Sequence, residues 1–216
     1  MRLQFKHGFY LLYLILTVIY LVVLSALPEG WRENAAVILI FSDPAAMGLF
    51  FMGAMILFEK SQSVHRALAV SPLSAGGYIL SKVLSLGIIS VLVAAVLAMG
   101  ASVLFLPEVI VATTVASMIF TLLGIIVAAH IDSLNQFLLW TVPVEMLCFV
   151  PALLYLFDVT PPIFRYYPIN VCMGIMAGRP VSWTEILSVM MFVVILYLAA
   201  CKCVKKMWRC SGGVRL

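Results

Sequence analysis

Residues 59–73 read EKSQSVHRALAVSPL, a polar stretch between two long apolar runs. At about 100° per residue, its small and apolar side chains fall on one side of a helix and its polar side chains on the other. Pro72 has no backbone N–H and disfavours helical geometry in Ser71, so a helix must end there. The stretch therefore predicts a short amphipathic helix over residues 61–70.

The composition is that of a membrane protein. The chain has 216 residues, of which 65% are hydrophobic and 10% are charged. A soluble domain would carry about 25% charged residues, and the apolar runs here are long enough to cross about 30 Å of hydrocarbon. We therefore expect a single all-α polytopic membrane domain over residues 1–216, with no sizeable soluble domain.

Six transmembrane helices are expected. The apolar runs place them at residues 9–27, 44–59, 78–106, 109–130, 136–157 and 184–201. The start of the second helix has two readings, because Ala35–Phe41 is also apolar and could extend it outwards. We favour a start at Pro44, since Asp43 can accept hydrogen bonds from the free N–H groups of a first turn and proline suits the first helical position. Ala35–Phe41 would then lie in the outer interface of the membrane.

The distribution of Lys and Arg predicts the orientation. These residues collect in cytoplasmic loops and ends, and all but three of the 13 fall on the cytoplasmic side if both termini are inside. The three that remain outside are Arg32, Arg165 and Arg179. We therefore expect a multi-pass protein of a bacterial plasma membrane with both termini inside. Its net charge of +4 reflects this topology and contact with anionic lipids, not binding of nucleic acid.

Motifs for catalysis and for nucleotide or metal binding are missing from the sequence. There is no Gly-x-x-x-x-Gly-Lys-Ser/Thr loop to hold a nucleotide, no Gly-x-Ser-x-Gly and no His-Glu-x-x-His. Cys201, Cys203 and Cys210 have no histidine nearby to complete a metal site, and Cys172 is the only cysteine expected outside. We therefore expect no enzyme activity, disulfide framework, metal or cofactor on this chain.

Several short motifs carry a resemblance to a known family. Asp43-Pro44 open the second span and Phe58-Glu59-Lys60 close it. The stretch ALAVSPL at residues 67–73 is followed by YILSK at residues 78–82. Together with six spans, this pattern resembles the type-2 ABC exporter permeases, and within them the fluoroquinolone export permeases.

The resemblance implies one half of an ATP-driven exporter. In that family the amphipathic helix between the second and third spans is a coupling helix, which sits in a groove of a separate cytoplasmic ATPase subunit that binds ATP and magnesium. A second permease half, either a copy of the chain or a related one, completes the membrane assembly. The residues expected at the ATPase contact are Glu59, Lys60, Gln62, His65, Arg66, Leu68, Ser71 and Pro72.

In the same family, the second and fifth helices face the substrate pathway. The pathway residues expected here are Asp43, Phe51, Met55, Trp140, Glu145 and Phe149. Glu145 is the only carboxylate expected well inside a span, and an ionisable group in hydrocarbon is a functional candidate. Two readings stay open for it: a contact with a cation or substrate, or a carboxyl group that braces the backbone freed by Pro143.

The outer segment, residues 158–183, also has two readings. It is rich in proline and aromatic residues, which break helices and anchor at membrane interfaces. The resemblance implies a loop that dips back into the outer leaflet as short re-entrant helices. The alternative is an ordered external loop with an aromatic belt.

Three classes of function remain. The first is the permease subunit of an exporter for a drug-like, peptide or other amphipathic substrate. The second is the substrate-binding membrane subunit of an energy-coupled importer, which would expose small-residue faces rather than a charged amphipathic loop helix. The third is an ATP-independent membrane immunity protein or enzyme. The polar stretch at residues 59–73 favours the first.

Overall fold

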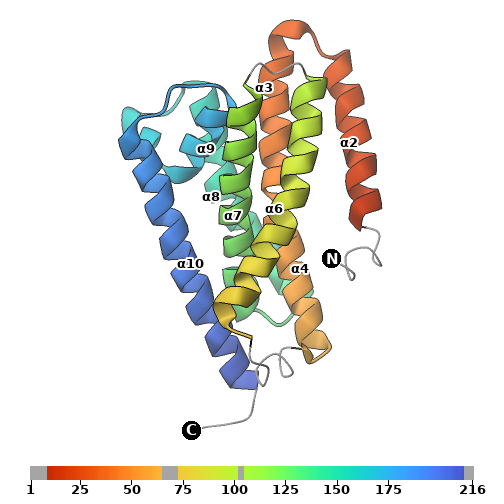
Figure 1. The fold of residues 1–216 in the computed structure, drawn as a ribbon, viewed down its shortest axis with the longest axis vertical. Coiled ribbons are helices and arrows are strands. Elements are labelled where there is room, and N and C mark those ends of the chain that lie inside the picture. The colour runs from red at the N-terminus through yellow and green to blue at the C-terminus, as the bar shows by residue number, and fades with distance from the viewer. Residues whose placement is uncertain (1–8, 65–72, 102–104, 212–216) are drawn as a thin grey trace.

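The computed structural model describes residues 9–64, 73–101 and 105–211, and this part of the chain consists of helices joined by turns, without a β-strand (Figure 1). The all-helical fold predicted from the sequence is confirmed for these residues. In chain order the elements are α2 (Phe9–Ala26), α3 (Glu29–Ile40), the π-helix η1 (Phe41–Ala45), α4 (Met47–Ser61), α6 (Ala75–Gly100), α7 (Leu106–His130), α8 (Leu134–Leu156), the 3-10 helix η2 (Pro162–Tyr166), α9 (Pro168–Met176) and α10 (Trp183–Ser211).

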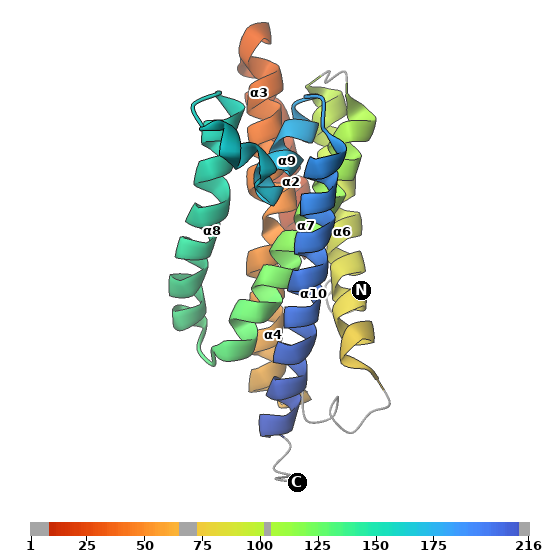
Figure 2. The same ribbon diagram turned by 90° about the vertical axis from the view of Figure 1, so that its left-hand side faces the viewer.

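Five segments of the described chain are long and apolar enough to cross a membrane. They are Glu29–Ser61, Ala75–Gly100, Leu106–His130, Leu134–Leu156 and Trp183–Arg209. Leu14–Ala26, within α2, is a shorter apolar helix. The long helices run side by side along one axis of the molecule in both views (Figures 1 and 2). The chain is therefore a helical bundle of membrane dimensions.

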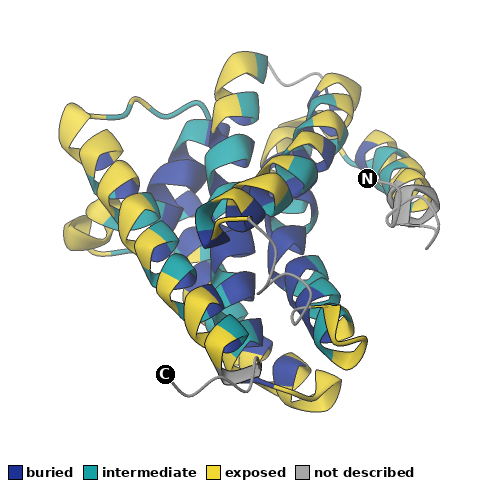
Figure 3. Cartoon of the chain, turned by 60° about the horizontal axis from the view of Figure 1, so that its bottom comes forward, coloured by how far each residue is buried: buried dark blue, intermediate teal, exposed yellow. Residues whose placement is uncertain are grey.

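α7 is the centre of this bundle. It packs against α4, α6, α9 and α10, and buried positions gather in the middle of the molecule while the outer helices are exposed (Figure 3). Glycine lets α4 approach α7 closely. A Cβ on Gly124 would lie 2.5 Å from the carbonyl oxygen of Leu49, and a Cβ on Gly48 would lie 2.3 Å from Oγ1 of Thr121. A larger residue at either glycine would push the two helices apart.

The second membrane segment is longer than predicted. It is helical from Glu29 to Ser61, so a helix start at Pro44 with Asp43 as its cap is wrong. Pro44 lies inside η1 instead. A π-turn moves the hydrogen bonds to partners five residues apart, and this local change tolerates a residue without an N–H. Ala35–Phe41 is part of this continuous helical segment and packs inside the bundle, where four of its residues are at most 3% exposed: Ala36, Val37, Ile40 and Phe41.

α8 and α10 lie at the edge of the bundle. Only 22% of the span in α8 and 17% of that in α10 are buried, against 61% in α7. Figure 2 shows α8 as an outlying helix. It meets α4 where a Cβ on Gly53 would lie 1.8 Å from the ring of Phe137, and it meets α9 at its other end. Most of the α8 surface is therefore left for lipid or for another chain.

The segment after α8 folds back onto the bundle. α9 has nine residues, too few to cross a bilayer. It packs against α7, α8 and α10, and Cys172 within it is 1% exposed. Gly178, at a positive φ of 69°, then turns the chain towards α10. The end of the molecule opposite residues 62–73 is thus closed by a short buried helix.

Candidate functional site

The first polar cluster lies where α4 ends and α6 begins, on either side of residues 62–73. Oε2 of Glu59 accepts a hydrogen bond of 2.5 Å from the hydroxyl of Tyr78. Oε1 of Glu59 lies 2.5 Å from Nζ of Lys82, and both side chains are 18% exposed. The ammonium group also lies 5.3 Å from the centroid of the Tyr78 ring. The cluster of Glu59, Tyr78 and Lys82 joins α4 to α6. We call it the inner corner, after the orientation predicted from the sequence.

Lys60 joins α4 to the end of α7. Its Nζ donates to the carbonyl oxygens of Ala129 at 3.3 Å and Ile131 at 2.7 Å, and it forms an ion pair of 3.0 Å with Asp132. A cation is favourable at the C-terminal end of a helix, where carbonyl oxygens lack partners. Glu59 and Lys60 are both held by the chain's own helices. Their expected contact with an ATPase stays a prediction.

The amphipathic segment begins later than predicted. Ser61 is the last residue of α4, and Gln62 and Ser63 form a turn in which Ser63 has a φ of 56°. Val64 is helical again, so a helix cannot run unbroken from Ser61. Gln62 is exposed. The other expected contact residues lie outside the described part of the chain: His65, Arg66, Leu68, Ser71 and Pro72.

Phe149 on α8, one of the expected pathway residues, packs against aromatic residues that were not in the expected set. Its ring stacks on Phe41 of η1, with centroids 5.8 Å apart. Phe41 in turn meets the edge of Phe120 on α7 at 5.6 Å. Glu145 lies one turn before Phe149 and is half-buried. Within the described residues no hydrogen bond joins Glu145 to the backbone near Pro143, so the bracing role has no support there.

The other pathway candidates face elsewhere. Asp43 receives a hydrogen bond from the Tyr20 hydroxyl of α2, and no described residue bonds its buried Oδ2. Phe51 packs beside Met47 and Ile89, and Sδ of Met55 lies 2.8 Å from the Lys82 ammonium. Trp140 is 59% exposed on the outer face of α8. The six predicted residues therefore do not form one site, because η1 and α4 are surrounded by helices and successive turns meet different neighbours.

The opposite end of the bundle holds a second polar cluster that the sequence analysis does not anticipate. The two terminal nitrogens of Arg179 pair with the two oxygens of Asp158 at 2.8 and 3.2 Å. They also donate to the carbonyl oxygens of Tyr155 at 3.2 Å and Leu156 at 2.8 Å, which end α8. The partners are more than 20 residues apart in sequence. Turns at Asp158 and Gly178, both at positive φ, bring them together.

Arg165 makes the second ion pair at this end. Its Nε donates to Oε1 of Glu185, a buried residue in the first turn of α10. This hydrogen bond and the carboxylate charge raise the pKa of Arg165, so the guanidinium stays charged. The other oxygen of Glu185 accepts the Ser182 backbone N–H at 2.7 Å. The two ion pairs, Arg179–Asp158 and Arg165–Glu185, hold η2 and the turn after α9 against α8 and α10. We call them the outer clasp, after the orientation predicted from the sequence.

Comparison with known proteins decides the family. The model of the fluoroquinolones export permease protein family matches residues 1–211. The chain belongs to this family. No curated protein matches it significantly. The resemblance inferred from the motifs is thereby confirmed, and the long apolar helices make this permease a multi-pass membrane protein.

Among the residues that the structure describes, most of the positive charge lies at one end of the bundle. Lys60 and Lys82 lie beside residues 62–73, and α10 ends with four exposed basic residues: Lys202, Lys205, Lys206 and Arg209. The C-terminal ends of α4 and α10 lie at the same end of the molecule, whereas the start of α3, η2 and α9 lie at the other (Figures 1 and 2). The two ends therefore differ in charge as the two sides of a membrane protein do.

Proposed function

We propose that the permease is the membrane half of an ATP-driven ABC exporter in a bacterial plasma membrane, moving a drug-like, peptide or other amphipathic substrate outwards. It works with a separate cytoplasmic ATPase, which binds ATP and magnesium, and with a second permease half that is a copy or a related chain. The observation that carries the proposal is the match to an export permease family, together with the inner corner, which joins the helices on either side of the polar sequence at residues 62–73.

The proposed topology has six spans with both termini inside. The charge difference between the two ends of the bundle supports this orientation. The 18 residues of α2 extend about 27 Å, which is close to the hydrocarbon thickness. With α2 as the first span, the five longer segments follow in alternating directions. Residues 62–73 and the basic end of α10 then face the cytoplasm.

The outer segment is proposed to be re-entrant. α9 is buried among membrane helices although it cannot cross the bilayer. Large apolar side chains around it are exposed, as expected where protein meets the membrane interface. They are Ile163, Phe164, Tyr166 and Trp183. This arrangement closes the outer end of the half-transporter.

The inner corner supplies a route for coupling. A displacement of residues 62–73 by an ATPase would act on α4 and α6 together, because the Glu59–Lys82 pair and the Tyr78 hydroxyl join them. The two hydrogen bonds and the ion pair of Lys60 would carry the displacement to α7. Such rigid-body motion serves transport only if ATP favours one of two states. α8, which is mostly exposed, is the proposed face towards the second half and the pathway.

Co-purification with a candidate ABC ATPase subunit from the same organism, followed by ATP-dependent uptake into inverted vesicles, tests the proposal. Arg66→Glu reverses a charge on the polar side of the expected coupling helix and should lower ATPase retention tenfold or more. Glu108→Arg, a charge reversal of the same size and opposite sign at the other end of the bundle, is the control and should leave ATPase retention unchanged. If wild-type protein retains no ATPase, or transports equally without it, the exporter proposal fails.

A further inference from the structure

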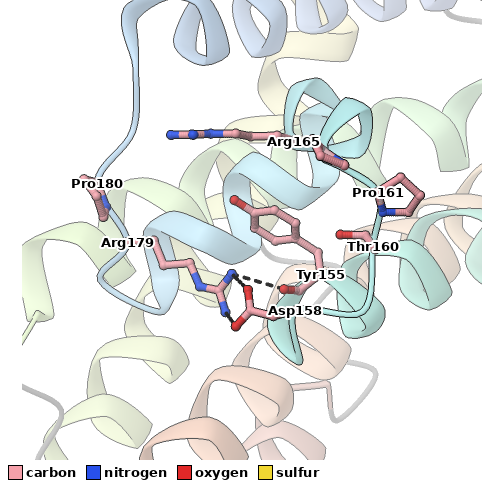
Figure 4. A pocket seen from close by; sticks show the side chains of 8 residues that line it. Tyr155, Asp158, Thr160, Pro161, Arg165, Arg179 and Pro180 are labelled. Carbon is pink, nitrogen blue, oxygen red and sulfur yellow. Dashed lines mark hydrogen bonds and ion pairs between the residues drawn. The ribbon is translucent and has the colours of Figure 1, made fainter.

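A cavity of about 310 Å³ lies at the outer end of the bundle, beside the outer clasp. Figure 4 shows Tyr155 at its centre, with Arg165 reaching across one side and Arg179 lying on the other. Asp158, Thr160 and three prolines complete the lining. This volume is at the lower end of the range for small-molecule sites. None of these residues belongs to the proposed pathway or to the inner corner.

The acceptor groups of the cavity are already engaged. Both oxygens of Asp158 bond the terminal nitrogens of Arg179, and those nitrogens also bond two backbone carbonyl groups of α8. The Arg179–Asp158 pair is thus neutral and complete, and the guanidinium lies 5.0 Å from the centroid of the Tyr155 ring. A ligand gains no ionic partner from this side of the cavity.

The donor groups of the cavity are not engaged in the same way. Arg165 bonds Glu185 through Nε, and within the described residues its two terminal nitrogens have no acceptor. Its side chain is 52% exposed, so these nitrogens can reach a ligand. The hydroxyl groups of Tyr155 and Thr160 likewise find no acceptor in the described part of the chain. The cavity therefore offers N–H and O–H donors to a molecule that brings acceptors.

The walls of the cavity suit an apolar body next to such an acceptor group. The Tyr155 ring and the rings of Pro161, Pro162 and Pro180 line it. Exposed Ile163 and Trp183 lie on η2 and at the start of α10, the elements beside it. Aromatic and apolar residues of this kind mark the interface between water and hydrocarbon, where amphipathic molecules collect.

We propose that this cavity binds the head of an amphipathic organic anion. The terminal nitrogens of Arg165 donate two hydrogen bonds to a carboxylate or phosphate, the geometry in which a guanidinium binds such groups most strongly. Tyr155 and the prolines contact the apolar part. An anionic lipid and an aromatic carboxylate share this chemistry. The inference concerns binding alone and stands whether or not the permease is driven by ATP.

Binding to the purified full-length permease in neutral detergent tests the inference. The probes are dihexanoyl phosphatidylglycerol, measured by native mass spectrometry, and 2-naphthoate, measured by equilibrium dialysis. Dihexanoyl phosphatidylcholine and 2-naphthamide are their uncharged-head controls. At least one anionic probe should bind tenfold more tightly than its control. Preference for phosphatidylglycerol identifies a lipid site, and preference for naphthoate identifies a solute site. If neither anion exceeds its control, the inference is overturned.

Three variants separate a ligand role of Arg165 from a purely structural one. Arg165→Gln should lower anion affinity tenfold or more, and Arg165→Lys should lower it less because it keeps the charge but loses the planar pair of donors. Glu185→Gln removes the competing carboxylate and should raise anion affinity. A structural ion pair predicts instead that Glu185→Gln and Arg165→Gln change affinity in the same direction. Either that result or unchanged binding in Arg165→Gln rejects the proposal. If Arg165→Gln does not fold, the test rests on Arg165→Lys, which should weaken anion binding, and Glu185→Gln, which should strengthen it.

Discussion

Single polar residues hold the ends of this bundle together. Glu59 contacts Tyr78 and Lys82 at once, and both charged side chains are largely withdrawn from water. Removing one partner of such a pair leaves the other charge without compensation, whereas removing both relieves the desolvation cost. The inner corner is therefore a place where single and double substitutions have different consequences.

Glu59→Gln should destabilise the permease by about 1–3 kcal/mol, because the Lys82 ammonium then loses its charged partner. The double variant Glu59→Gln/Lys82→Met should recover at least half of that loss. Thermal unfolding in detergent measures both. Lys205→Met, which removes an exposed lysine of α10, is the control and should change stability by less than about 0.5 kcal/mol. Additive losses in the double variant would show that the two side chains do not act as a pair.

Among the helices, α4 and α7 depend most on small residues. The predicted Cβ of a residue at position 124 would lie 2.5 Å from a backbone oxygen of α4, and backbone cannot move aside as a flexible side chain does. Gly87 on α6 is different, because a Cβ there would meet nothing within 4 Å. Glycine therefore has a packing role at the α4–α7 contact and none at position 87.

Gly124→Ala should lower stability by about 1–3 kcal/mol, since the added methyl group forces α4 and α7 apart. Gly87→Ala is the matched control. It should be neutral or stabilise the protein by up to about 1 kcal/mol, because alanine is the better helix former. Thermal unfolding of both variants in the same detergent checks this contrast. Equal stability of the two variants would contradict the close contact of α4 and α7.

At the scale of the whole molecule, the two ends differ in charge and in closure. One end carries the C-terminal end of α4 and the basic end of α10, and the other is closed by α9 and the outer clasp. Cys172, the only cysteine expected outside, is 1% exposed and cannot report on the orientation. Engineered cysteines at exposed positions are therefore needed to test the orientation.

In intact cells a membrane-impermeant maleimide should label Thr184→Cys, at the start of α10, and should not label Lys205→Cys near its end. Both should react after the membrane is permeabilised. The wild-type chain gives the background, because its one cysteine expected outside, Cys172, is buried. Labelling of Lys205→Cys but not Thr184→Cys in intact cells would reverse the proposed orientation.

The sequence by itself determined the membrane class, the helical fold and the family. Each of these follows from quantities that add up along the chain: apolar runs of membrane length, scarce charges, and short motifs around Asp43 and residues 59–82. These conclusions require no knowledge of which helices are neighbours. The end of α4 near Ser61 could also be predicted without it, because a polar run replaces an apolar one there.

Only the tertiary structure decided what the polar side chains do. Lys60 donates to a backbone carbonyl group just after α7, and Arg179 donates to one at the end of α8. Asp43 accepts a hydrogen bond from Tyr20 on α2. Each of these partners is distant in sequence. The continuous helix through Pro44 also depends on packing, because burial of Ala36, Val37 and Ile40 among other helices favours it over a break. Local preference predicted a helix start there, and the free energy of burying that apolar face outweighed it.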